Sequence, residues 1–212
     1  MTVLGADAGR RGVAVRYASR RWAFVGPVPL AASLRAELDA EGAVDVLIQQ
    51  TAFHNTFVPE ACDAFPEARA YTARGARKAS LPADRLGKLP GDLPAEVSSA
   101  LLPIPIEGMR AGFEVDFVHP ASRTLIVADL LMHFPDRAPS FWTGLFRRTF
   151  GWAPGARMPT LFRWMLKDRP AVAASLDRIL EHPIERIVVS HGEPIESGAQ
   201  AVLEGIRDRL AS

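Results

Sequence analysis

Three short apolar runs in this chain each lead into a residue type that binds metal ions. The runs are rich in β-branched residues, which is typical of strands covered on both faces. They end at His54, Asp129 and His191. In open α/β folds the carboxyl ends of the strands meet at one edge, so residues far apart in sequence come together there. The runs therefore predict an α/β (α+β) fold with a His, Asp, His cluster at one edge of a sheet.

The same pattern also has an ordinary interpretation. A polar residue after an apolar run is often only the first residue of a loop, and a single histidine is more often a hydrogen-bonded core or surface residue than a metal ligand. The repetition of the pattern favours a shared site. Two neutral imidazoles and one carboxylate can hold a single zinc, iron or manganese ion and leave positions open for water or substrate.

The composition limits the class of protein. With 212 residues, 48% hydrophobic and 23% charged, the chain can bury a sizeable core, and we expect one domain over residues 1–212. A net charge of +1 gives no reason to expect nucleic acid as a partner. We expect a small-molecule substrate or ligand instead.

The cysteine count and the hydropathy pattern indicate a compartment. Cys62 is the only cysteine, which excludes an intrachain disulfide and a cysteine-based zinc site and fits a reducing environment. The first residues lack an unbroken apolar stretch, and no run reaches the length of a membrane span. We therefore expect a cytoplasmic protein.

Periodicity and turn residues predict the order of the elements. Strands are expected over 13–17, 22–25, 44–48, 68–72, 101–106, 113–118, 124–127 and 184–189, with 101–106 at a sheet edge. Helices are expected over 30–40, 59–65 and 197–210. The Pro- and Gly-rich residues 80–95 predict an irregular surface connection, whereas the region from Asp129 to about residue 180 has a helical and aromatic pattern.

Three segments in this order resemble the metallo-β-lactamase fold superfamily over most of the chain. They are VDVLIQQTAFHNTFVPEACDAFPEARAY, FEVDFVHPASRTLIVADLL and RIVVSHGEP. They are similar to the segments that carry the superfamily's His-x-His-x-Asp-His motif, its bridging aspartate and its last His-Gly. The resemblance implies a four-layer αββα sandwich of two mixed sheets with a metal site at one edge.

The chain departs from the superfamily motif at several positions. His54 matches its fourth ligand, whereas Gln49, Thr51 and Phe53 stand where the earlier ligands are expected, and Met109 stands near a further histidine position. The matching ligands belong to one of the two usual metal sites, so an ordinary binuclear zinc hydrolase is not expected. The pattern resembles an uncharacterised bacterial family, a domain of unknown function, that lacks the full motif.

The remaining polar residues suggest a mechanism. Water bound to zinc has a pKa near roughly 7 and could supply hydroxide for hydrolysis. Glu193, two residues after His191, is a candidate partner of that ligand or a general base, or else a solvent-facing loop carboxylate. His133 would share a face with Asp129 if this segment were helical, which makes it a candidate extra ligand; a packed or exposed loop histidine is the alternative.

An aromatic and basic stretch follows Asp129, and residues 130–170 are expected to form a helical insertion or lid. Its large rings are Trp142, Phe146, Phe150, Trp152, Phe162 and Trp164. They could pack onto the sheet, cover a pocket, form a homodimer surface or, least in keeping with the helix-breaking Gly and Pro residues, lie on a membrane.

Two functional hypotheses result. The first is a metal-dependent hydrolase with a reduced, mononuclear site and an unknown substrate. The second is a non-catalytic descendant of the same fold that binds a ligand or a partner, because a fold supports architecture better than activity. Phe53 and Met109 favour the second hypothesis, and the complete three-ligand face favours the first.

Overall fold

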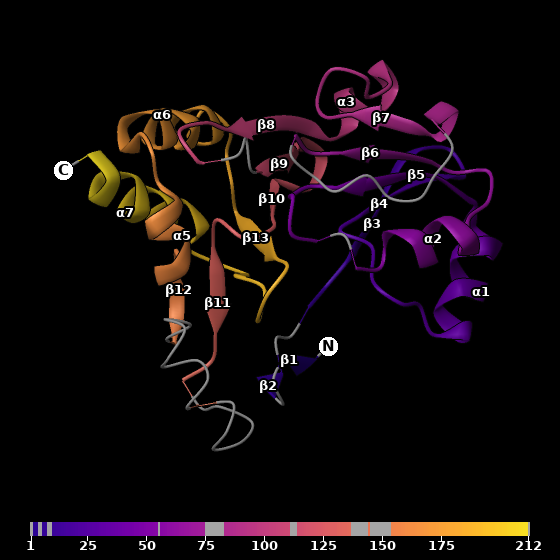
Figure 1. Cartoon of the computed structure of the whole chain (residues 1–212), viewed down its shortest axis with the longest axis horizontal. Helices are drawn as coiled ribbons and strands as arrows, with labels where there is room; N and C mark the ends of the chain where they lie inside the picture. The colour runs from indigo at the N-terminus through magenta and orange to yellow at the C-terminus, as the bar shows by residue number, and fades with distance from the viewer. Residues whose placement is uncertain are drawn as a thin grey trace.

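Two mixed β-sheets form the centre of the structure, a computed structural model (Figure 1). The structure describes residues 2–3, 6–7, 10–54, 56–74, 83–110, 114–136, 144 and 154–211. Within these residues, the two large sheets stand face to face and carry helices on their outer sides.

The first sheet has the strand order β3-β4-β5-β6-β7. Its strands are β3 (Val13–Ala18), β4 (Arg21–Val25), β5 (Ala43–Gln49), β6 (Arg69–Thr72) and β7 (Leu86–Lys88). The first two form the expected antiparallel hairpin, and every later neighbour is parallel. Since parallel neighbours point the same way, their carboxyl ends lie at one edge of this sheet.

The second sheet has the order β13-β10-β9-β8. Its strands are β8 (Leu102–Ile106), β9 (Glu114–His119), β10 (Thr124–Val127) and β13 (Arg186–Val189). β8, with its two prolines, is an edge strand, and β9 and β10 form the predicted hairpin through a 3₁₀ turn, η2 (Pro120–Ser122). The last pair, β10 and β13, is parallel.

Helices cover the outer faces of the two sheets. α1 (Ala32–Glu41) and α2 (Val58–Ala64) lie against β5, and α6 (Arg169–Leu180) packs against both β8 and α7 (Ala199–Ala211). The short α3 (Ala95–Ala100) contacts the edge strands β3 and β8. Figure 1 shows α6 and α7 on one outer side of the molecule and α1 and α2 on the other.

Alternating side chains divide the core into three layers of apolar packing. Ala23, Val46 and Ile48 of the first sheet meet Val115 and Phe117 of the second in an inner cluster. A second cluster joins the outer face of the first sheet to α1 and α2, and a third joins the outer face of the second sheet to α6 and α7. The chain is thus the predicted αββα sandwich.

Two predictions about local structure were wrong. Residues 86–88, expected in an irregular connection, form β7 parallel to β6, and Ala95, the last residue of that expected connection, begins α3 (Ala95–Ala100). In the stretch expected to be helical, Met132–Phe134 and Gly155–Arg157 pair as antiparallel strands β11 and β12. The helical expectation holds for α5 (Thr160–Met165) and α6.

Some expectations stay predictions. Trp142, Phe146, Phe150 and Trp152 lie outside the described residues, so the insertion or lid over 130–170 is described only in part. The single domain over residues 1–212 also remains an expectation. Among the helices that the structure describes, none combines the length and the apolarity that crossing a membrane requires.

Candidate metal centre

The structure brings His54, Asp129 and His191 together in one buried cluster. The Nε2 atom of His54 lies 3.0 Å from Oδ1 of Asp129 and 3.0 Å from Nε2 of His191. Nε2 of His191 lies 3.5 Å from the same carboxylate oxygen. All three residues are buried, and one ligand atom of each lies within 4.8 Å of the other two.

These distances suit a shared metal ion. Donor atoms about 2.0–2.1 Å from one metal are separated by about 2.8–3.0 Å in octahedral and about 3.3–3.4 Å in tetrahedral geometry. Two imidazole nitrogens and a carboxylate oxygen so close together need a proton or a cation between them. The other Asp129 oxygen, Oδ2, is buried and accepts no hydrogen bond from the described residues. The donor set thus fits a divalent ion.

Neighbouring strands of the second sheet present two of the three candidate ligands. In the parallel pair β10 and β13, Val127 is opposite Val189, and each ligand follows two residues later. The backbone N–H of Ser190 donates to the carbonyl of Val127 at 3.0 Å, which extends the pairing beyond the strand ends. The register of this sheet therefore sets the separation of Asp129 and His191.

The neighbours of Asp129 stabilise its charge. Burial raises the pKa of the Asp129 carboxyl, but His54, His191 and the Thr51 hydroxyl outweigh this effect and hold the pKa below its usual value. Asp129 is therefore an anion at neutral pH, which is the form that binds a metal.

Glu114, which the sequence analysis did not single out, holds the turn that carries Asp129. Its carboxyl group accepts hydrogen bonds from the backbone N–H groups of Ala128, Asp129 and Leu130 at 2.8–3.1 Å. Glu114 is completely buried on β9. Such a carboxyl group fixes three consecutive peptide units at once, so it defines the backbone path through Asp129.

A second buried acid, Asp116, lies beside Glu114 on the same strand. Burial, together with the adjacent carboxyl groups, raises the pKa of Glu114 well above its usual value. Burial likewise raises the pKa of Asp116, to about 7. Two carboxyl groups this close in a dry interior do not both ionise readily, so the pair keeps a proton near neutral pH.

Arg10 and Arg11, near the N-terminus, contact both the segment that carries His54 and the segment that carries His191. Arg10 pairs with His191 through a backbone bridge, and its guanidinium donates to the carbonyl of His54 at 3.3 Å. Arg11 donates from its side chain to the carbonyl of Gly192 at 2.9 Å. Burial lowers the pKa of Arg10 whereas the charge of Asp129 raises it, with a net lowering. Arg10 places a cation beside the cluster.

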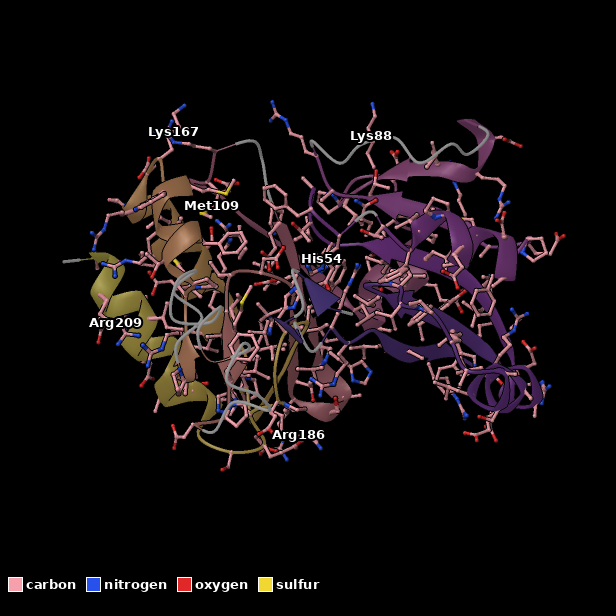
Figure 2. All side chains as sticks on the ribbon, turned by 60° about the horizontal axis from the view of Figure 1, so that its bottom comes forward. His54, Lys88, Met109, Lys167, Arg186 and Arg209 are labelled. Atoms are coloured by element: carbon pink, nitrogen blue, oxygen red, sulfur yellow. The ribbon has the colours of Figure 1, made fainter. Side chains whose placement is uncertain are left out.

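The positions that depart from the superfamily motif have structural roles. Gln49 is buried and donates to the carbonyl of Thr51 at 3.1 Å, and Thr51 borders Asp129. Phe53 is 53% exposed and meets Phe162 edge to face, with ring centroids 6.3 Å apart. Met109 is buried in the core of the second sheet, and Figure 2 shows it apart from His54.

The other two candidate residues, His133 and Glu193, lie beside each other on different segments of the chain. His133 is on strand β11 rather than on a helix, so the expected helical face shared with Asp129 does not exist. Its Nδ1 atom lies 3.0 Å from the backbone oxygen of Glu193. Glu193 is exposed, and its backbone N–H donates to the carbonyl of His133 at 2.7 Å. The role of the Glu193 side chain stays a prediction.

Comparison with known proteins supports the architecture. No protein-family model matches the sequence, and no curated protein matches it. Among solved structures, the DIM-1 metallo-β-lactamase has a TM-score of 0.57 and 12% identity, covering 96% of this chain and 86% of its own. The BLEG-1 B3 metallo-β-lactamase gives 0.55 and 14%, covering 94% and 93%. The chain has the metallo-β-lactamase fold.

The peroxy diiron species of the chemotaxis sensor ODP has the same fold. Its structure gives a TM-score of 0.56 and 11% identity over 91% of this chain and 82% of its own. The fold predicted from the sequence is thus confirmed, whereas the bacterial family of unknown function stays a prediction. Arg10, Glu114 and Asp116 are the neighbours of the centre that sequence reasoning missed. Only the two acids left a signal, since they alternate within an apolar strand.

Proposed function

We propose that this protein is a metal-dependent hydrolase with a single metal ion held by His54, Asp129 and His191. The observation that carries the proposal is the approach of three buried ligand atoms to within 3.0–3.5 Å of one another. A zinc, iron or manganese ion suits this mixed set of two imidazoles and one carboxylate. Solved structures of the same fold that are named as metallo-β-lactamases or as a diiron protein support this choice of cofactor.

A bound ion would supply a Lewis acid and a water of lowered pKa. The residues of the chain provide the surroundings that such chemistry needs. Asp129 stays ionised because two imidazoles and Thr51 stabilise its charge. Arg10 offers a cationic group beside the cluster, and its buried Nε makes no hydrogen bond with the described residues. The proposal therefore favours a small-molecule substrate with an anionic group or one that develops negative charge on hydrolysis.

The proposal assigns proton transfer to Glu193. It is exposed on the turn directly after His191, where solvent can exchange its proton. A Glu193→Gln variant should lose hydrolytic rate while keeping its metal content, because an amide cannot accept or donate the proton in the way a carboxyl group does. An unchanged hydrolytic rate would remove Glu193 from the mechanism.

The first test is metal content, measured by plasma mass spectrometry on tag-free protein. We expect about one equivalent of zinc, iron or manganese in the native chain and its loss in a folded His54→Ala and His191→Ala double variant. His182→Gln is the matched control, since its imidazole lies in the turn between α6 and β13, outside the cluster. A native protein that holds no metal and takes up none when ions are added would overturn the proposal.

A second candidate function is ligand or partner binding without catalysis. Phe53 is 53% exposed at a position where the superfamily has a ligand, and Trp164 is 77% exposed on α5. An apolar surface of this kind fits a partner or a homodimer contact. Sedimentation of the native chain and of a Trp164→Ala variant tests the homodimer. Metal binding without turnover of any hydrolase substrate, together with a Trp164-dependent dimer, would favour this second function.

The cellular location is also part of the proposal. Cys62 is free and buried in the core around α2, as is ordinary for a protein of a reducing compartment. We therefore place the protein in the cytoplasm, and fractionation of cells that express it natively would test this.

A further inference from the structure

A cavity on the helical side of the second sheet is lined by arginine and apolar side chains. Its volume is about 460 Å³, which lies in the range of small-molecule sites. The lining residues are Ala156, Arg157, Met158, Thr160, Arg163, Leu166, Arg169, Ile206, Arg209 and Leu210. They come from β12, α5, α6 and α7 and from the segments beside them, which lie together on one side of the molecule in Figure 1.

The lining of this pocket is strongly cationic. It holds four arginines, and no acidic residue is among the described residues that line it. The whole chain carries a net charge of only +1, so this is a local concentration of positive charge. Arg207, which is on α7 but does not line the pocket, is neutralised by neighbouring acids: it forms ion pairs with Asp177 at 3.2 Å and with Asp208 at 2.9 Å.

The arginines of the pocket have different roles. Arg169 donates to the backbone carbonyls of Arg209 and Leu210 and thereby caps the C-terminus of α7. The side chains of Arg157 and Arg163 are exposed, and neither guanidinium group makes a hydrogen bond or ion pair with another residue that the structure describes. Arg169 therefore supports the wall of the pocket, whereas Arg157 and Arg163 have guanidinium donors to offer a ligand.

The lining of the pocket also includes an apolar wall. Leu166, Ile206 and Leu210 contribute aliphatic surface, together with Met158 and Ala156. Ile206 and Leu210 are also part of the core beneath the helices, so this wall is anchored by packing. A fully hydrated inorganic anion would leave such a surface unused.

We infer that this pocket binds a small amphipathic polyanion, a molecule with two or more phosphate or carboxylate groups and an apolar portion. Guanidinium groups form paired, charge-assisted hydrogen bonds with the oxygens of such groups. The apolar portion lies against Leu166, Ile206 and Leu210. The guanidinium groups bind the anionic groups of the ligand, and the apolar wall favours ligands that also have an apolar portion.

This pocket is separate from the candidate metal centre. The two share no residue, and Figure 2 shows Arg209 far from His54. The inference therefore does not depend on the proposed hydrolase activity. It assigns the chain a second ligand site.

Isothermal titration calorimetry tests the inference with adenosine diphosphate, pyrophosphate and adenosine as probes. We expect the diphosphate nucleoside to bind more tightly than pyrophosphate, because it adds a ring for the apolar wall, and adenosine alone to bind far more weakly than either. An Arg157→Gln and Arg163→Gln double variant should weaken nucleotide binding roughly tenfold or more. Both side chains are exposed, so these changes should not disturb folding.

Two control variants test whether the nucleotide binds in this pocket. Arg207→Gln removes one positive charge outside the pocket, from helix α7, which carries Arg209 of the pocket, and should leave the affinity for the nucleotide nearly unchanged. The His54→Ala and His191→Ala variant should also keep the affinity, and it is needed because phosphates can bind a metal at the centre. Adenosine binding as tight as that of the nucleotide, unchanged affinity in the double arginine variant, or loss of affinity only in the histidine variant would each overturn the inference.

Discussion

The two sheets contribute to the metal centre in different ways. The second sheet presents Asp129 and His191 from the adjacent parallel strands β10 and β13, each two residues beyond a paired valine. The first sheet presents His54 from a loop that continues five residues past the end of β5 at Gln49. One half of the centre is thus built on strand register, and the other half on a loop.

The supporting contacts follow the same division. Glu114 holds the Asp129 turn through three backbone N–H groups, and the carbonyl of His133 holds the turn after His191. The carbonyl of His54, in contrast, is held by the side chain of Arg10 at 3.3 Å. We conclude that the second-sheet half is part of the folded core. Substitutions in that half should lower the free energy of unfolding, whereas substitutions in the loop that carries His54 should lower the metal affinity alone.

The largest effect is expected at Gly192, beside His191. Its φ is +95°, and a Cβ atom there would overlap the carbonyl oxygen of His133. Gly192→Ala should lower the free energy of unfolding by about 4 kcal/mol, because the left-handed backbone and the backbone overlap both oppose a side chain. Urea unfolding followed by circular dichroism measures this change.

Gly91→Ala is the matched control for that variant. A Cβ at Gly91 would meet no atom within 4 Å, so we expect the free energy of unfolding of Gly91→Ala to differ from the native value by no more than about 0.5 kcal/mol. If both variants were equally stable, the turn after His191 would not be part of the rigid half, and the contrast between the two sheets would be lost.

The next effect is expected at Glu114. Glu114→Gln replaces one acceptor oxygen by an amide that points hydrogens at backbone N–H groups, so the turn at Asp129 loses its support. We expect a loss of about 3 kcal/mol in the free energy of unfolding and a weaker metal affinity. Unfolding in chelator and metal titration measure the two effects separately. Glu185→Gln, at an exposed ion pair with Arg123, should change stability by less than about 0.5 kcal/mol.

The buried acids also predict a pH dependence in the second-sheet half. The pKa of Asp116 is raised from 3.8 to about 7 in the folded chain. Between these two values the folded state keeps a proton that the unfolded state has released. The contribution of this proton to the free energy of unfolding is fully present below pH 3.8 and is lost as the pH rises through about 7. Between pH 5 and pH 8 the metal-free protein should lose about 2 kcal/mol.

Asp116→Asn tests that origin, because asparagine does not titrate. Its free energy of unfolding should fall less steeply than that of the native chain over the same interval of pH, because Glu114, whose pKa burial also raises, is the one acid left in the pair. A variant as pH-dependent as the native chain would show that other groups are responsible.

The strand half of the site was also the part that the sequence predicted best. The β-branched runs before Asp129 and His191 predicted strands β10 and β13 and placed both ligands at their ends, whereas the four-layer sandwich was predicted from the resemblance to the metallo-β-lactamase superfamily. Packing of parallel strands on both faces imposes that pattern on a sequence, so it can be recognised without a structure.

Other features left little or no pattern. β7 has three residues with a glycine in the middle, too few for alternation to show, and its Pro-rich surroundings suggested a loop. The apolar stretch at β11 resembled a helix because a short run cannot distinguish the two periods. Arg10 reaches the centre through a bridge between residues far apart in sequence, which no local rule predicts.

The smallest effect should occur at Thr51, in the loop half. Its hydroxyl helps to keep the pKa of Asp129 low, and it lies between Gln49 and His54 in the segment that lacks the earlier superfamily ligands. Thr51→Val keeps the shape but removes the hydroxyl, so the charge on Asp129 loses one stabilising neighbour. We expect metal affinity to fall roughly tenfold, as for other partners of metal ligands. The free energy of unfolding of the metal-free protein should change by less than about 1 kcal/mol.

Metal titration and urea unfolding of Thr51→Val test the two parts of this prediction. Thr160→Val is the control, because Thr160 is exposed at the start of α5. If Thr51→Val cost as much stability as Glu114→Gln, the loop would belong to the rigid core, and the metal centre would be one preorganised unit instead of a strand-built half completed by a loop.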